Sequence, residues 1–274
     1  MIPAHFDYVR ANSLDEAIAL LVQHGDDAKL LAGGHSLLPL MKLRLAQPAV
    51  LVDIGPLRSL SYVKDEGDYV AVGALTRHHD IATSPVALAS APVLAHVAGQ
   101  IGDPQVRHRG TIGGSISHGD PASDLPAVLL ALGGTMVAQG PNGQREIAAA
   151  DFFVSFFEVA LAPDEVLVEV RVPKSSDGQW GFEKLTKRAQ DWAIVGAVAV
   201  RSSGGVGVGL INMGPVPLRA SAVEAALAAG SNAADAAALA GDGTEPAADF
   251  NGSAAYRQHL ARVLVRRALE KAGV

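Results

Sequence analysis

Two short glycine-rich segments, far apart in the chain, constrain its fold more than any other feature. The first is Ala32-Gly33-Gly34-His35-Ser36, and the second begins Thr111-Ile112-Gly113-Gly114-Ser115. Paired glycines let a backbone approach a ligand closely, and flanking Ser and Thr hydroxyls add hydrogen-bond donors. We therefore expect each loop to offer several donors to one anion. Two such loops that converge on a diphosphate would suit a dinucleotide cofactor.

The common phosphate-binding signatures are absent from the sequence. It contains neither the G-x-x-x-x-G-K-[ST] motif of a P-loop nor the G-x-G-x-x-G motif of a Rossmann fold. The glycines of the segment 204–209 also miss that spacing, and we interpret them as a hairpin turn between strands. A single glycine pair usually marks a tight turn. The prediction of a cofactor site therefore depends on two loops with matching Ser and Thr flanks.

The charge and the cysteine content of the chain exclude some classes of function. The net charge is −6 and cysteine is absent, so neither a basic nucleic-acid footprint nor a thiolate-bound iron–sulfur cluster is expected. A redox group in this chain would have to be organic. No apolar run is long enough to cross a membrane and no signal peptide is evident, which predicts a cytoplasmic chain without a membrane span.

Local patterns predict three units, over residues 1–55, 56–175 and 176–274. The first is a small β-α-β-type unit, with a helix that Ser13 caps and Gly25 ends. The second contains hairpins that turn near 65–68 and 140–143. The third combines a three-stranded sheet with helices. Further expected helices cover 76–82, 85–101, 125–132, 221–229, 233–239 and 253–272, and further expected strands cover 29–31, 50–54, 60–63, 69–73, 135–138, 145–147, 166–172, 180–186, 194–201 and 206–212.

The sequence resembles the FAD-binding medium subunits of molybdenum hydroxylases over nearly its whole length. The resemblance lies in the run Leu30–Pro39, in Lys42-Leu43-Arg44, and in the run from Thr111 through Asp120-Pro121-Ala122-Ser123-Asp124. It is greatest to the subunit of aerobic carbon monoxide dehydrogenase and lower to the flavin domain of xanthine dehydrogenase. It implies an α+β fold: a two-part FAD-binding domain of the PCMH (vanillyl-alcohol-oxidase-like) type, followed by a domain of a three-stranded antiparallel sheet with helices.

The resemblance also implies a set of cofactor-binding residues and no catalytic residue or metal ligand in this chain. The two glycine loops would hold the diphosphate and ribityl oxygens of FAD, Asp124 and Lys184 would lie near the flavin, Ile101 and Leu167 would pack on the adenine, and Trp192 would stack on the ring. The implied FAD-binding residues are Ala32, Gly33, Gly34, His35, Ser36, Ile101, Thr111, Ile112, Gly113, Gly114, Ser115, Asp124, Leu167, Lys184 and Trp192.

Several of these residues have a simpler structural interpretation. Asp124 could cap a helix that begins near Pro126, Lys184 could be an ordinary surface lysine, and Ile101, Leu167 and Trp192 could be core residues. Ser115 departs from the Asp or Asn of many relatives, which removes one polar contact while leaving the backbone donors.

The histidines and the arginines beside them invite other hypotheses. His78, His79, His108 and His118 lack the spacing of a metal site. His35 could carry a covalent flavin, although the resemblance implies non-covalent binding. The segment 107–109 is interpreted as a solvated loop, with a partner contact as the second possibility.

The function implied is electron transfer within a complex. A small [2Fe-2S] subunit would deliver electrons, a large molybdopterin subunit would hydroxylate the substrate, and FAD in this chain would pass the electrons to an external acceptor. The assembly implied is a dimer of heterotrimers. Two alternatives stay open: a stand-alone FAD-dependent oxidase or reductase, and a scaffold subunit that has lost its cofactor.

Overall fold

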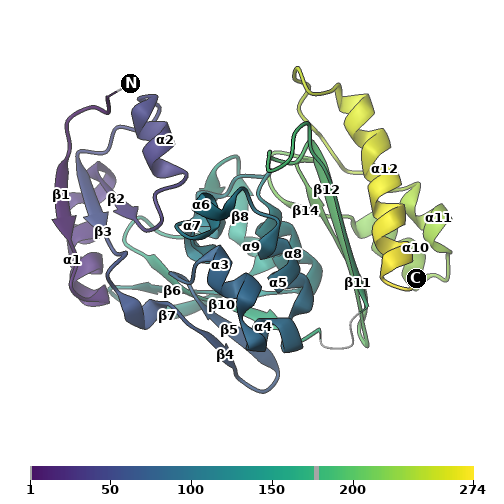
Figure 1. Ribbon diagram of the computed structural model, residues 1–274, viewed down its shortest axis with the longest axis horizontal. Helices are drawn as coiled ribbons and strands as arrows, with labels where there is room; N and C mark the ends of the chain where they lie inside the picture. Colours follow the sequence, from purple (N-terminus) through teal and green to yellow (C-terminus); the bar gives the residue numbers. More distant parts are fainter. Residues whose placement is uncertain (1, 176–178) are drawn as a thin grey trace.

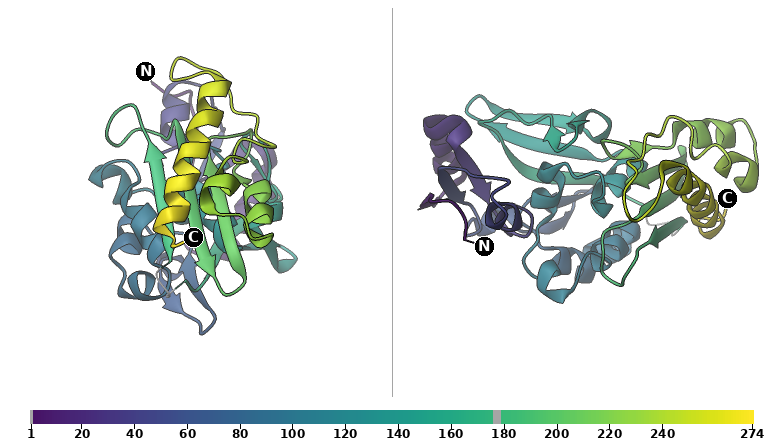
Figure 2. Two further views of the ribbon diagram at one scale, coloured as in Figure 1. Left: turned by 90° about the vertical axis from the view of Figure 1, so that its right-hand side faces the viewer. Right: turned by 90° about the horizontal axis from the view of Figure 1, so that it is seen from above.

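Three parts of the chain lie in a row in this computed structural model, which describes residues 2–175 and 179–274. Seen from above, the purple N-terminal part, the teal middle part and the green-to-yellow C-terminal part follow one another (Figure 2). The expected boundary after residue 175 falls at 176–178, outside the described residues. Each part is built on its own main sheet (Figure 1).

The N-terminal part is a parallel three-stranded sheet in the order β1-β3-β2. Helix α1 follows the predicted signals: the Ser13 hydroxyl accepts from the Glu16 amide at 3.1 Å, and Gly25 ends the helix with a φ of 53°. A first strand, which the sequence analysis did not predict, completes the sheet. The elements are β1 (Asp7–Arg10), α1 (Leu14–His24), η1 (Gly25–Asp27), β2 (Ala28–Leu31), α2 (Leu37–Lys42) and β3 (Val50–Asp53).

The middle part contains an antiparallel sheet in the order β4-β5-β10-β6-β7. The single helix expected over 85–101 is wrong: the chain breaks at Ala91, because Pro92 cannot donate the next helical hydrogen bond and starts a new helix. The elements are η2 (Arg58–Leu60), β4 (Val63–Asp65), β5 (Tyr69–Gly73), α3 (His78–Thr83), α4 (Pro85–Ser90), α5 (Pro92–Gly99), α6 (Pro104–Arg107), α7 (Ile112–His118), α8 (Asp124–Leu132), β6 (Thr135–Gly140), β7 (Gly143–Ala148), α9 (Ala149–Phe152), β8 (Phe153–Ser155), β9 (Glu158–Val159) and β10 (Val166–Pro173).

The C-terminal part contains an antiparallel sheet of four strands, in the order β11-β12-β13-β14. The expectation of three strands is therefore wrong. The fourth strand, Leu218–Arg219, has only two residues, too few for a recognisable alternation of apolar and polar side chains. The elements are β11 (Trp180–Leu185), β12 (Val195–Ser202), β13 (Gly205–Ile211), β14 (Leu218–Arg219), α10 (Ser221–Ala228), α11 (Ala233–Ala237) and α12 (Ala254–Lys271).

Helix α8 joins the middle part to the C-terminal sheet by close packing on β13. A Cβ atom at Gly207 would lie 1.9 Å from the carbonyl oxygen of Ala131, and one at Gly209 would lie 2.1 Å from that of Ala127. Any side chain at these two positions would push the helix away. Of the glycines in the segment 204–209 that we interpreted as a turn, only Gly205 has the positive φ of a turn. Gly207 and Gly209 instead allow the close packing of α8. Helix α12 covers the same sheet along β11 and β12.

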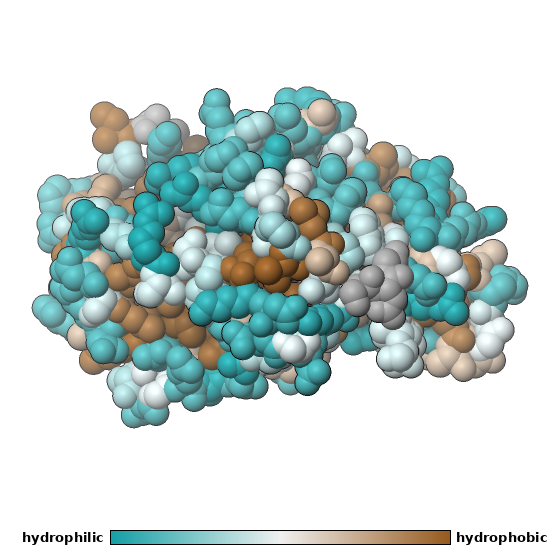
Figure 3. Space-filling view, turned by 60° about the horizontal axis from the view of Figure 1, so that its bottom comes forward, coloured by the Kyte–Doolittle hydropathy of each residue, from teal (hydrophilic) through white to brown (hydrophobic). Residues whose placement is uncertain are grey.

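The face in Figure 3 is mostly hydrophilic, with apolar residues gathered in separate patches. Among the helices of residues 2–175 and 179–274, none combines the length and the apolar character that a membrane span requires.

Candidate functional site

The first glycine loop connects the end of β2 to the start of α2. Gly34 has a φ of 77°, a conformation that glycine adopts at low cost. Among the described residues, none of the backbone hydrogen bonds uses the amides of residues 33–36 as donors. A run of free amides around a left-handed residue forms a concave anion site. The amides of this loop are therefore unpaired in the backbone network, and their binding of a ligand stays a prediction.

The amides of the second segment are already used inside the protein. Thr111 caps helix α7, and its hydroxyl accepts from the Gly114 amide at 3.1 Å. The amides of Ile112 and Gly113 donate to the carbonyls of Thr76 and Ala74 at 3.0 and 2.8 Å. The expectation that this loop also supplies several free backbone donors is therefore wrong.

The amide of Ser115 is not free either, because it donates to the Thr111 carbonyl at 3.0 Å. What the second segment can offer a ligand is the Ser115 side chain and the open surface over Gly114, which is exposed.

The first loop touches the backbone of the two residues that precede the second segment. A Cβ atom at Gly33 would lie 2.2 Å from the carbonyl oxygen of Arg109 and 2.9 Å from the Cα of Gly110. The His35 ring lies beside Gly33, with Nδ1 3.1 Å from the Gly33 carbonyl oxygen. Only glycine allows this contact at position 33, and the convergence of the two segments on one diphosphate stays a prediction.

A buried ion pair lies at the junction between the middle and C-terminal parts. Lys184 on β11 donates from Nζ to Oδ2 of Asp124 at 2.7 Å, and the two side chains are 12% and 5% exposed. Asp124 is the first residue of α8, whose N-cap is Ser123. Asp124 is therefore not the N-cap, and Lys184 is not an ordinary surface lysine.

The second carboxylate oxygen of Asp124 is a free acceptor. Oδ1 is buried and has no hydrogen-bond partner among the described residues. Burial raises the pKa of Asp124, and Lys184 offsets part of that rise. A buried acceptor of this kind requires a donor, and the hydroxyl and ring N–H groups of FAD would supply one. The residues present thus fit the cofactor that the resemblance implies.

A cavity opens beside Lys184. It measures ≈ 560 Å³ and is lined by the end of α5 and the segment through α6, by β11 and the segment after it, and by Lys271 of α12. That volume lies within the range of small-molecule sites, about 300–1,000 Å³. Ile101 is next to this cavity in the chain, and it packs against the main core while only partly buried.

The two remaining predicted residues lie in very different surroundings. Leu167 is on β10 and is 5% exposed within the main core, as the structural interpretation expected. Trp192 is 60% exposed, so the interpretation of Trp192 as a core residue is wrong. The carbonyls of the next two residues, Ala193 and Ile194, accept from the Asn212 side-chain amide, which fixes the backbone behind Trp192.

The sequence did not identify the buried contact between His78 and Gly110, the residue before the second glycine segment. Its side chain is 4% exposed, and a Cβ atom at Gly110 would lie 2.9 Å from its Cδ2. The His78 amide donates to the Gly110 carbonyl at 3.0 Å. No local spacing marks this role. Two of the other histidines, His79 and His108, stack with their ring centroids 4.0 Å apart.

We expect His78 to stay neutral well below physiological pH. Burial, with a smaller contribution from the charges of His35 and Arg107, lowers its pKa from 6.5 to about 4. The unfolded chain takes up this proton near pH 6.5, so the free energy of unfolding falls as the pH drops towards 4, by up to about 3 kcal/mol. NMR titration of the ring and urea unfolding at several pH values measure both effects.

The matched variants are His78→Gln and His259→Gln, since His259 is exposed. Only His78→Gln should flatten the pH dependence of unfolding. A ring resonance of His78 that titrates near pH 6.5 would contradict this prediction.

Comparison with known proteins gives consistent matches over the whole chain. The family model described as "FAD binding domain in molybdopterin dehydrogenase" matches residues 4–175, and that of the "CO dehydrogenase flavoprotein C-terminal domain" matches residues 180–272. The carbon monoxide dehydrogenase medium chain of Hydrogenophaga pseudoflava is 44% identical, over 99% of this chain and 98% of the relative.

Two further matches extend this comparison. Subunit alpha of the 6-hydroxypseudooxynicotine dehydrogenase complex of Paenarthrobacter nicotinovorans is 38% identical, over 99% of this chain and 96% of the relative. Among solved structures, carbon monoxide dehydrogenase from Hydrogenophaga pseudoflava lacking the Mo-pyranopterin moiety superposes with a TM-score of 0.96 at 46% identity, covering 100% of this chain and 99% of the matched chain.

Proposed function

The chain belongs to the family of FAD-binding medium subunits of molybdenum hydroxylases, and from this premise we propose that it is the electron-transfer flavoprotein of such a complex. FAD, when bound, supplies a ring system that takes up and releases one or two electrons. The observation that carries the proposal is the buried Asp124–Lys184 pair, because its free Oδ1 acceptor is unexplained without a ligand.

Different residues of this chain would bind different parts of the cofactor. The free amides of residues 33–36 would bind the diphosphate, and Asp124 Oδ1 would accept a hydrogen bond from the ribityl or ring region. The ammonium of Lys184 lies beside the larger cavity, where a positive charge favours negative charge on a neighbouring ring. Trp192, exposed and on a fixed backbone, would cover the ring.

Partners follow from the family. We propose a small [2Fe-2S] subunit, a large molybdopterin subunit, assembly as a dimer of heterotrimers and an external electron acceptor. The matched relative named as a subunit of a dehydrogenase complex supports the multi-subunit reading. The two relatives act in different dehydrogenases, so the substrate of this complex is set outside this chain. The division into units 1–55, 56–175 and 176–274 also stays a proposal.

The test is purification of the tagged full-length chain from its native host. We expect a flavin absorption spectrum, together with molybdenum and iron that co-purify in fixed ratio to the chain. A colourless chain without flavin would favour the scaffold alternative. Turnover of a small substrate by this chain alone, free of molybdenum and iron, would favour the stand-alone oxidase and overturn the proposal.

A further inference from the structure

A second pocket lies between the N-terminal and middle parts. It measures ≈ 250 Å³. Arg10, which ends β1, and Asp53, which ends β3, line it from the carboxyl edge of the parallel sheet. Arg77 and Thr111 line the opposite wall and form an isolated β-bridge with one another. Ligands of open parallel sheets commonly bind at this edge.

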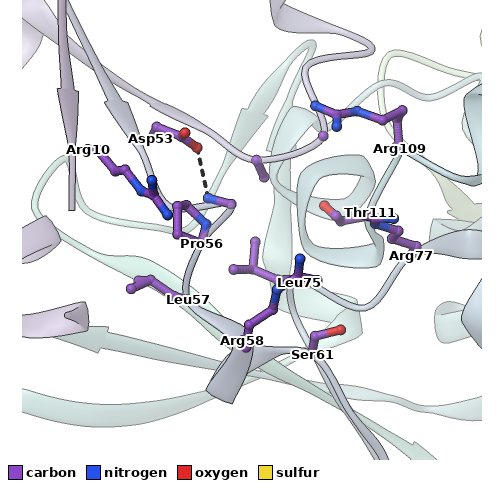
Figure 4. Close-up of a pocket in the computed structure, with 13 residues that line it drawn as sticks. Arg10, Asp53, Pro56, Leu57, Arg58, Ser61, Leu75, Arg77, Arg109 and Thr111 are labelled. Carbon is purple, nitrogen blue, oxygen red and sulfur yellow. Dashed lines mark hydrogen bonds between the residues drawn. The ribbon is translucent and has the colours of Figure 1, made fainter. Parts of the chain in front are cut away.

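Four arginines face this pocket, which is unusual in a chain with a net charge of −6. Arg10, Arg58, Arg77 and Arg109 all line it. In Figure 4 the side chains of Arg10, Arg58 and Arg109 reach inward from three sides, and Arg77 lies beside Thr111. Across residues 2–175 and 179–274, the hydrogen bonds and ion pairs include no acceptor for any of the four guanidinium groups. Arg10, Arg58 and Arg109 are exposed and Arg77 is partly buried, so water screens their mutual repulsion, and their unpaired guanidinium groups are accessible to an anion.

The one carboxylate in the pocket does not neutralise the arginines. Asp53 accepts from the Tyr8 hydroxyl through Oδ2 at 2.5 Å and from the Gly55 amide through Oδ1 at 2.9 Å. The lining therefore carries four positive charges against one negative charge whose two oxygens both have partners.

This pocket is distinct from the larger part of the proposed FAD site. It shares only Ala32, Gly33 and Thr111 with the fifteen residues that the sequence assigns to FAD, whereas Lys184 lines the other cavity. Residues 34–36, whose amides are free, do not line the four-arginine pocket. The pocket thus lies against Gly33 and Thr111, and its lining shares no residue with that of the Lys184 cavity.

The chemistry of the lining indicates the class of ligand. Guanidinium groups bind phosphate oxygens in a planar, bidentate manner. A volume of ≈ 250 Å³ is smaller than the sites of drug-sized ligands, about 300–1,000 Å³, so a whole dinucleotide would not fit. We propose that this four-arginine pocket is a second anion site, which binds inorganic phosphate or pyrophosphate, or the terminal phosphate of a larger ligand, while FAD occupies its own site.

The test is calorimetric titration of the FAD-loaded full-length chain with inorganic phosphate and with pyrophosphate, at constant ionic strength. We expect one saturable site per chain. In the Arg58→Gln/Arg77→Gln variant, affinity should fall about tenfold for each guanidinium removed, since each charge-assisted hydrogen bond contributes about that factor. The matched control is Arg266→Gln/Arg267→Gln, which removes the same charge from the exposed surface of α12.

The FAD content of each sample is read from its absorption, so failure of this inference and failure of the FAD assignment are distinguishable. The single variant Arg58→Gln replaces the double variant if circular dichroism shows the latter to be unfolded. Three results would overturn the inference: no saturable binding to the FAD-loaded chain, equal weakening in the control, or binding only to FAD-free chain with displacement by FAD. The last result would mean that the pocket belongs to the diphosphate of FAD itself.

Discussion

Replacing Lys184 by methionine is expected to lower the free energy of unfolding by about 3–5 kcal/mol at neutral pH and to reduce flavin retention strongly. The substitution leaves the Asp124 carboxylate buried without its cation, 5% exposed at the start of α8. Urea unfolding and the ratio of FAD to protein measure the two losses. Unchanged stability together with full flavin content would show that the pair supports neither.

The same variant should show a pH dependence of defined sign. Burial already raises the pKa of Asp124 above its ordinary value of 3.8, and Lys184 lowers it; without Lys184 the pKa rises further. A raised pKa in the folded state means that the folded chain binds the proton more tightly than the unfolded chain. The stabilisation from that proton is present at low pH and is lost as the pH rises through the raised pKa. The stability deficit of Lys184→Met relative to wild type should therefore shrink on acidification.

The double variant Asp124→Asn/Lys184→Met is the control for this interpretation. It removes the uncompensated charge and keeps the size of the side chain, so it should recover much of the stability lost in Lys184→Met. Flavin retention should stay low, because the carboxylate acceptor is absent. Recovery of both properties would mean that the carboxylate has no part in binding the cofactor.

Replacing Gly33 by alanine is expected to remove most of the bound FAD and to cost about 1–3 kcal/mol of stability through overpacking. The added Cβ would lie 2.2 Å from the Arg109 carbonyl oxygen, and that backbone atom cannot rotate away as a side chain could. The first loop must move away from Arg109, which displaces the free amides of that loop. Flavin absorbance per chain and urea unfolding measure the result.

Two other glycines calibrate the effect of this substitution. At Gly204 the nearest atom to an added Cβ is the Ser202 hydroxyl oxygen at 3.7 Å, and at Gly114 it is the Thr111 hydroxyl oxygen at 2.9 Å. Gly204→Ala should be silent, and Gly114→Ala should be milder than Gly33→Ala because a side-chain atom can adjust. If Gly33→Ala protein kept its full flavin content, the close contact between Gly33 and Arg109 would not be needed for FAD binding.

Local sequence signals predicted the elements whose evidence lies within a few residues. The Ser13 cap and the Gly25 stop fixed helix α1, and the Gly140-to-Gly143 turn fixed the β6–β7 hairpin. The same signals did not predict α7 as a helix, since its paired glycines resemble a loop, nor the two-residue strand β14. Caps and turns depend on contacts between near neighbours, and short or glycine-rich elements depend on what packs against them.

Three conclusions came from the sequence alone: the presence of two glycine loops, the exclusion of thiolate ligands by the absence of cysteine, and the expectation of FAD from the resemblance. Each depends only on residue types and their order. The tertiary structure decided which backbone donors are free, and it paired Asp124 with a lysine from another sheet. It also brought four arginines from separate elements around one pocket. Such pairings depend on how closely α8 packs on β13 and on how the parallel sheet faces the middle part. Distances of this kind come from packing between residues far apart in the chain, and residue spacing does not encode them.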